Sequence, residues 1–289
     1  MSLSDIHTEQ EKAFLEAFNI PFPYVPPEPK FAEKIDPRKI LVLADPHEPF
    51  SLQRVYDNAL ANHHDAAMVV IPGDLGDYYS KSRFKKTHYV SFRDEVEAIF
   101  HRMEWLSAHW PQVKIMLGNH DNRPEKAIQS LLQVDVELLI LTEARLLHHM
   151  AAYFPNIEVV QHQIVNTGCG LTFLWPYGDI LFAHVQISRT QASATTEYID
   201  HWLYDWDGVF KLPKYRLLLQ AHNHQSDKRD IDGRTLMLAP TASDIYSVAM
   251  EYARGPKPMK LPPATGYTVL YHDEGRVSTN ECHNIILRS

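Results

Sequence analysis

Residues that can bind metal ions follow five separate apolar runs in this chain. Their side chains offer carboxylate and amide oxygens and imidazole nitrogens, which hold divalent cations in many proteins. The chain has only two cysteines, both outside these groups, so any metal is expected to have nitrogen and oxygen ligands. The five groups are Asp45-Pro46-His47, Gly73-Asp74, Gly118-Asn119-His120-Asp121, His184 and His222-Asn223-His224.

Two of these groups place candidate ligands two residues apart. In an extended chain alternate side chains point to the same side, so Asp45 and His47 can chelate one cation if strand geometry continues to them. His222 and His224 can likewise bind one cation each or share one, and the alternative is a pair of solvated loop histidines. Another Asp-x-His tripeptide ends at His7, where no strand precedes it. The pattern therefore has meaning only through its setting.

Two glycines surround the second group. In Gly73-Asp74-Leu75-Gly76-Asp77 they permit a tight turn directly after an apolar run. Such a turn would bring Asp74 to the edge of a sheet, with Asp77 just behind it. A later Gly-Asp pair at 178–179 lacks a preceding buried run, and we interpret it as a hairpin turn.

The third group is the most specific of the five. Asn119 offers a carbonyl oxygen that coordinates a cation without adding negative charge, and the His120-Asp121 pair suits an imidazole oriented by a carboxylate. His184 is the least specific, since a lone histidine after an apolar run is more often a hydrogen-bonded core residue. His184 is a candidate ligand only because the other four groups are present in the same chain.

The apolar runs before these groups are short enough to be buried strands. Neighbouring parallel strands end at one edge of a sheet, so the polar residues are expected to gather there. Apolar residues at helical spacing separate the first three runs, around 52–60 and 96–106, and a longer helical pattern covers 124–153. The later part of the chain is strand-rich. The five runs are 39–44, 68–72, 113–117, 180–183 and 216–221.

Composition narrows the class of protein further. A chain of 289 residues with 45% hydrophobic residues can bury a large core, and its net charge of -8 argues against non-specific binding of duplex DNA. We expect no signal peptide and no membrane span, and the scarcity of cysteine favours the cytoplasm. A short helix at 8–20 and the proline-rich residues 21–29 predict an N-terminal strap, residues 1–38, laid on one domain, residues 39–289.

In order, spacing and strand placement, the five groups resemble the motifs of the calcineurin-like metallophosphoesterases. The resemblance covers residues 39–224. It implies an α/β fold: a four-layer sandwich of two mixed β-sheets packed face to face and flanked by helices. It also implies two divalent metal ions and a metal-activated hydroxide as nucleophile. Mn is the favoured metal, and Fe, Zn, Co and Ni are alternatives.

The resemblance assigns a role to each polar residue. One metal would be held by Asp45, His47 and His224, the second by Asn119, His184 and His222, and Asp74 would bridge the two. His120 would contact the phosphate and protonate or stabilise the leaving oxygen. Asp121 would orient His120, and Asp77 would lie behind the ligands.

Two departures from the family bear on the substrate. The protein-phosphatase branch has arginines that clamp a phosphomonoester, and Tyr78 and Leu117 stand in their places here. This difference favours a phosphodiesterase, with a phosphomonoesterase as an alternative. Intact His120 and a complete set of candidate ligands argue against the further alternative, a catalytically silent binding scaffold.

A basic and aromatic segment follows the second group. Tyr78, Lys81 and Arg83 are candidates for a substrate rim that grips a nucleotide or nucleic-acid backbone, and the alternative is a charged surface loop. The segment is also similar to phage-type members of the family. The expected partner is therefore a phosphoester, with a DNA or RNA nuclease as a competing function. The role of residues 241–263 is not indicated by any motif.

Overall fold

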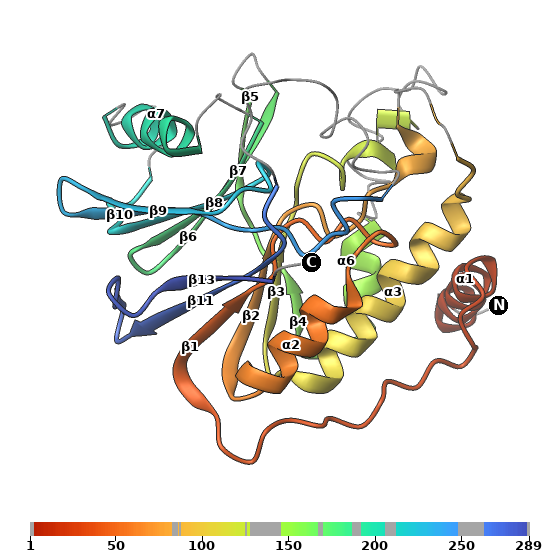
Figure 1. Cartoon of the computed structure of the whole chain (residues 1–289). Helices are drawn as coiled ribbons and strands as arrows, with labels where there is room; N and C mark the ends of the chain where they lie inside the picture. Colours follow the sequence, from red (N-terminus) through yellow and green to blue (C-terminus); the bar gives the residue numbers. More distant parts are fainter. Residues whose placement is uncertain are drawn as a thin grey trace.

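The protein is a sandwich of two mixed β-sheets, with helices on the outer face of each sheet (Figure 1). The computed structural model describes residues 3–82, 86, 88–124, 126–127, 146–166, 170–186, 192–205, 212–247 and 263–287. The predicted four-layer α/β architecture is confirmed. Within these ranges no helix is both long and apolar enough to cross a membrane.

The first sheet contains the strands that precede the first three polar groups. Its strands lie in the order β12-β11-β1-β2-β3-β4, and β13 pairs with β11. Strands β1 to β4 are mutually parallel, whereas β11 runs antiparallel to β1. The strand bounds are β1 Asp36–Val42, β2 Ala66–Pro72, β3 Val113–Met116, β4 Ile157–Val159, β11 Gly266–Asp273, β12 Arg276–Val277 and β13 His283–Ile286.

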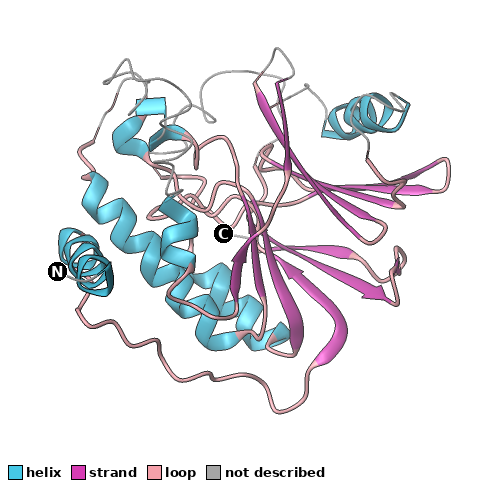
Figure 2. Ribbon diagram, turned by 180° about the vertical axis from the view of Figure 1, so that it is seen from behind, coloured by secondary structure: helices cyan, strands magenta, loops and turns pink. Residues whose placement is uncertain are grey.

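Helices cover the outer face of this sheet, as Figure 2 shows from behind. The side chain of Ser91 caps the longest of them, α3, by accepting a hydrogen bond from the amide of Asp94 at 3.1 Å. A 3₁₀ turn, η1, lies between β2 and α3. The bounds are α1 Leu3–Ala17, α2 Gln53–His63, η1 Tyr79–Lys81, α3 Phe92–His109 and α6 Leu146–Ala151.

The second sheet carries the remaining two polar groups. Its strand order is β5-β6-β7-β8-β10-β9, with β7, β8 and β10 parallel to one another. Helix α7, Ala192–Asp205, lies on its outer face (Figure 1). The strands are β5 Gln163–Asn166, β6 Leu171–Tyr177, β7 Ile180–Val185, β8 Leu217–Ala221, β9 Asp227–Ile231 and β10 Arg234–Leu238.

Successive residues of the central strands pack into different layers of core. Leu41 faces the helices of the first sheet, and its neighbour Val42 faces the second sheet. Leu218 packs on the α7 side, while Leu217 and Leu219 face the first sheet. Because both faces are buried, these strands have continuous apolar sequences rather than alternating ones. Most of the polar residues therefore come after the strands end, and His184, the penultimate residue of β7, is the exception.

The N-terminal segment lies along α3 before it enters β1. The hydroxyl of Tyr24 donates to Glu104 at 2.8 Å, and the amide of Lys30 donates to the carbonyl of Ala108. The helix expected at 8–20 is α1, and it begins and ends several residues earlier than predicted. Of the helical pattern predicted at 124–153, residues 125 and 128–145 lie outside the described ranges.

Candidate metal centre

The five polar groups meet at one edge of the two sheets. The loops after β1, β2 and β3 bring residues from the first sheet, and β7 and the loop after β8 bring residues from the second. Six of the seven candidate ligands form two clusters, in each of which the nitrogen and oxygen atoms lie within 4.8 Å of one another. The clusters are Asp45, His47 and His224, and Asp74, His184 and His222.

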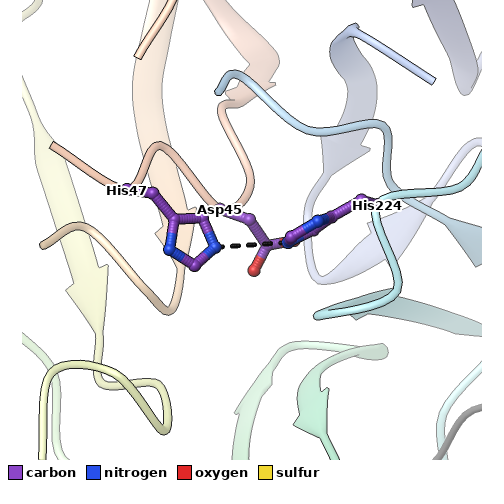
Figure 3. A group of neighbouring side chains, drawn as sticks. All are labelled: Asp45, His47 and His224. Carbon is purple, nitrogen blue, oxygen red and sulfur yellow. Dashed lines mark hydrogen bonds and ion pairs between the residues drawn. The ribbon is translucent and has the colours of Figure 1, made fainter. Parts of the chain in front are cut away.

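In the first cluster two imidazoles and a carboxylate point at the same spot (Figure 3). The Nε2 atoms of His47 and His224 are 3.2 Å apart, and the Oδ2 atom of Asp45 is 4.0 Å from Nε2 of His224. All three side chains are buried. Two imidazole nitrogens that face the same position can both coordinate one cation there.

The second cluster is built around His184. Its Nε2 atom lies 3.3 Å from Oδ2 of Asp74 and 3.0 Å from Oδ1 of Asn119, which places the seventh candidate ligand in this cluster. The ring of His222 is 5.1 Å from that of His184, centroid to centroid. Oδ2 of Asp74 is also 3.8 Å from Nε2 of His47, so this carboxylate reaches both clusters.

The residues present fit a pair of divalent cations. Oδ1 of Asp45 and Oδ2 of Asp74 are buried and have no hydrogen-bond partner among the residues that the structure describes. A buried carboxylate oxygen without a donor is costly, and a coordinated cation would satisfy it. The donor set is carboxylate, amide and imidazole, which suits Mn, Fe, Zn, Co and Ni alike.

The backbone is left-handed rather than extended at five of the seven candidate ligands, whereas His184 lies within β7. Strand β1 ends at Val42 and β8 at Ala221, so the condition that strand geometry continues to Asp45 and His47 is not met. His222 and His224 do not lie on an extended segment either. A left-handed backbone is uncommon outside glycine and is often found at functional sites, where the surrounding structure enforces it. The residues with positive φ are Asp45 (47°), His47 (54°), Asp74 (52°), His222 (83°) and His224 (56°).

Two glycines allow the loops of the site to approach one another closely. A Cβ atom on Gly118 would lie 2.2 Å from Oδ1 of Asp74, and one on Gly73 would lie 2.4 Å from Nδ1 of His184. The same Asp74 oxygen accepts a hydrogen bond from the amide of His120 at 2.8 Å. Only glycine fits at both positions, as the sequence indicated for the turn at Gly73.

Asp77 orients two histidines from behind. Its Oδ1 atom accepts hydrogen bonds from Nδ1 of His47 at 2.9 Å and from Nδ1 of His120 at 2.7 Å. These bonds leave the Nε2 atom of each ring facing the site. Burial acts to raise the pKa of Asp77, but His120 and His47 together hold it well below its usual range. Asp77 therefore remains a carboxylate.

Asp121 does not orient His120, contrary to the expectation from the resemblance. Its carboxylate accepts hydrogen bonds from the amides of Gly76 at 3.0 Å and Gly118 at 2.8 Å, and so joins two loops of the site. Burial raises the pKa of Asp121 to about 7, and the negative charge of Asp74 adds to the shift. The orienting carboxylate is Asp77, because the turn after Gly76 directs it toward the imidazole.

The protonation of the histidines matters because only the neutral nitrogen binds a metal. Burial lowers the pKa of His222 to about 3 and that of His224 well below its usual value. Burial acts in the same direction on His184, but the charges of Asp74 and Asp45 outweigh it and raise the pKa to about 9. Nδ1 of His184 donates to the carbonyl of Pro72 at 3.1 Å, so a cation would compete with the proton on Nε2.

Two supports of the site carried no recognisable signal in the sequence. The hydroxyl of Thr241 donates to the carbonyl of Asp45 at 2.8 Å, and Thr241 also forms an isolated bridge with Ala44. This contact gives the start of the 241–263 segment a structural role. Nη1 of Arg123 donates to the carbonyl of Asp77 at 2.8 Å, and its Nη2 lies 3.0 Å from Nε2 of His120.

The predicted substrate rim is only partly accounted for. Tyr78 is fully buried in the core, with its ring 6.1 Å from that of Phe92, so its prediction as a rim residue is wrong. Its positive φ of 49° belongs to the turn that leads into η1. The ammonium of Lys81 lies 4.7 Å from the centroid of the Phe92 ring. Arg83 is outside the described residues.

A buried ion pair anchors the first ligand loop to α3. Nε of Arg102 donates to Oε1 of Glu48 at 2.5 Å, and its guanidinium lies 3.6 Å from the centroid of the Tyr56 ring. The two charged side chains are only 11% and 5% exposed. Arg102→Ala would leave the Glu48 carboxylate buried without its partner. We expect it to lower the free energy of unfolding by about 3 kcal/mol or more, measured by urea denaturation.

The matched control for this prediction is Arg229→Ala. Arg229 pairs with Glu197 at 2.7 Å, but both side chains are 44% exposed. Water screens such a pair, so its loss should change the free energy of unfolding by about 1 kcal/mol or less. Equal effects of the two substitutions would show that the Arg102 pair does not anchor the loop.

Comparison with known proteins identifies the family. Residues 38–244 match the model of the calcineurin-like phosphoesterases. No curated protein sequence matched the chain. Among solved structures, wild-type Vps29 with zinc from Entamoeba histolytica is 12% identical and covers 86% of this chain and 98% of its own, at a TM-score of 0.38. An archaeal phosphodiesterase is 11% identical and covers 86% of this chain and 99% of its own, at a TM-score of 0.41. The family match spans most of the chain, which therefore belongs to the calcineurin-like phosphoesterase family.

Proposed function

We propose that this protein is a dinuclear, metal-dependent phosphodiesterase. The observation that carries the proposal is the position of Asp74, whose Oδ2 atom lies 3.8 Å from Nε2 of His47 and 3.3 Å from Nε2 of His184. One carboxylate thus stands between the two clusters. Two divalent cations held there would supply a nucleophilic water at neutral pH and neutralise charge on the phosphoryl group, and Mn is the favoured ion.

The chain's own residues would then divide the remaining work. Asp77 holds the rings of His47 and His120 by their Nδ1 atoms, so that neither ring can turn away. His120 is placed to contact the phosphoryl group through Nε2 and to assist departure of the leaving oxygen. Asp121 fixes the backbone of the loops that carry Asp74 and Asn119.

The preference for diesters rests on the residues at two positions of the family's arginine clamp. Tyr78 is buried and Leu117 is apolar, so neither can bind the second negative charge of a phosphomonoester. The protein should be freed of metal, reloaded with Mn, and assayed on a bis-aryl phosphodiester and an aryl phosphomonoester. We expect faster cleavage of the diester, and no activity after chelation.

The outcomes separate the alternatives. Much faster cleavage of the monoester would overturn the diesterase preference while leaving a phosphoesterase. Cleavage of single-stranded or duplex DNA in a parallel incubation would favour a nuclease. No hydrolysis of any ester by protein shown to contain two Mn per chain would contradict the proposed function.

A further inference from the structure

Arg123 brings a fixed positive charge to the candidate metal centre. The ion pairs of the site's carboxylates, within the described part of the chain, involve histidines and the guanidinium of Arg123. The Arg123 side chain is 16% exposed, while that of Asp77 is almost fully buried. Arg123 is therefore the more accessible partner of this ion pair.

Contacts at one end hold the guanidinium in a defined orientation. Nη1 donates to the carbonyl of Asp77 at 2.8 Å and lies 3.3 Å from its Oδ2 atom. The other terminal nitrogen, Nη2, points to Nε2 of His120 at 3.0 Å. Arginine can only donate, so Nε2 of His120 accepts from Nη2 in this arrangement without substrate. Nε2 could act as a donor to the leaving oxygen only after Nη2 has turned to the substrate. Nδ1 of His120 then carries the proton that is donated to Asp77.

The imidazole of His120 is close to the carboxylate of Asp74 as well as to Arg123. Nε2 of His120 is 4.0 Å from Oδ2 of Asp74, the carboxylate between the two clusters. Because Nη2 of Arg123 is 3.0 Å from Nε2 of His120, a phosphoryl group that contacts His120 can also be reached by Nη2. A guanidinium presents parallel N–H donors that match the oxygens of a phosphoryl group.

We propose that Arg123 binds a non-bridging oxygen of the substrate's phosphoryl group. It would supply one positive charge, from a position three residues after His120, for one non-bridging oxygen that a phosphodiester also has. A single guanidinium anchored on Asp77 does not replace the two arginines that Tyr78 and Leu117 leave out, so the diester preference stands. The inference deepens the proposed function and rests on it. Arg123 then contributes to substrate binding through Nη2, while Nη1 stays anchored on Asp77.

Orthophosphate is a suitable probe because it contains the phosphoryl oxygens without a leaving group. Binding of orthophosphate to Mn-loaded protein should be measured by titration calorimetry for the wild type, Arg123→Gln and Arg123→Lys. We expect Arg123→Gln to raise the Kd for phosphate by roughly 10- to 100-fold, the effect of losing a hydrogen bond to a charged group. Arg123→Lys keeps the charge but loses the fork, so its Kd should lie between the two.

Metal content and a control variant make the result specific. Arg123→Gln should retain the wild-type Mn content, because Arg123 contacts none of the candidate ligands. Arg229→Gln, on the exposed surface, should bind phosphate like the wild type. If Arg123→Gln is misfolded by circular dichroism, Arg123→Lys decides the question, through its phosphate Kd and its separate effects on KM and kcat.

The inference and the proposed function can fail separately. Phosphate binding that depends on Arg123, in a protein that hydrolyses no ester, would support the inference and contradict the function. Ester hydrolysis with the same phosphate Kd in the wild type and in both Arg123 variants would contradict the inference alone. Failure of the wild type to bind phosphate would also overturn it.

Discussion

Asp74→Asn is expected to remove metal and activity together. Its Oδ2 atom is buried between the two clusters, and in the described part of the chain it accepts no hydrogen bond. An amide at this position has one fewer oxygen and no negative charge, so both cations would be bound more weakly. We expect fewer than two Mn per chain by elemental analysis after dialysis. The rate of diester cleavage should fall by roughly 100-fold or more, since even partners behind the ligands change affinity or activity by 10- to 100-fold.

The control for this substitution is Asp57→Asn on the exposed face of α2. Asp57 accepts a hydrogen bond from Gln53 at 2.8 Å within the helix and is not one of the candidate ligands. It should leave the Mn content and the rate unchanged. A fully active Asp74→Asn protein with two Mn per chain would show that this carboxylate does not join the two clusters.

His120→Asn is expected to do the opposite: the metal stays and the rate falls. The His120 ring is within hydrogen-bonding distance of Asp77 and Arg123, whereas Oδ2 of Asp74 is 4.0 Å from its Nε2 atom. Asparagine removes the imidazole that would protonate or stabilise the leaving oxygen. General acid catalysis contributes about 10²- to 10⁴-fold, so kcat should decrease by that factor at an unchanged Mn content.

Leaving-group dependence sharpens the test of His120. Diesters with poor leaving groups need protonation more than those with good ones, so the loss in kcat should be greatest for an alkyl leaving group. His101→Asn, at an exposed position of α3, is the matched control and should be as active as the wild type. Equal kcat values for His120→Asn and the wild type on both substrates would remove the acid role from His120.

Much of the fold and most of the site's membership could be predicted from the sequence. The central strands are buried on both faces, so each of them is visible as a short apolar run that ends at or close to a polar residue. The runs 68–72 and 113–117 correspond to β2 and β3, and each predicted end lies within two residues of the observed one. The carboxyl ends of these strands had to meet at one edge of the first sheet, which is why distant residues such as Asp74 and Asn119 could be expected in one place. His184 comes from the second sheet, so only the family resemblance placed it there.

The details of geometry could not be predicted in the same way. The left-handed backbone of Asp45 and His47 comes from loop packing, since strand periodicity stops being informative beyond Val42. Side-chain partners across loops also depend on packing. Adjacency in sequence pointed to Asp121 as the partner of His120, whereas the fold brings Asp77 to that ring from another loop.

Arginine 123 shows what a motif-based reading omits. Tyr78 and Leu117 stand where the protein-phosphatase branch of the family has arginines. These two positions therefore give no sign of a guanidinium at the site. The chain turns after His120, with the amide of Arg123 donating to the carbonyl of His120 at 2.9 Å, and this turn returns the side chain to the site. A position in sequence is therefore a poor guide to which residue supplies a charge in space.

The candidate ligands come from both sheets, and this has a consequence for the mechanics of the fold. The amide of His222, after β8, donates to Oδ2 of Asp45, after β1, at 2.9 Å, so the two halves already touch at the site. Cations bound by residues of both halves would act as a cross-link between them, and their binding would be coupled to how tightly the layers dock. Residues in the layer between the sheets, such as Met116 and Phe182, would then tune cation affinity without contacting a cation.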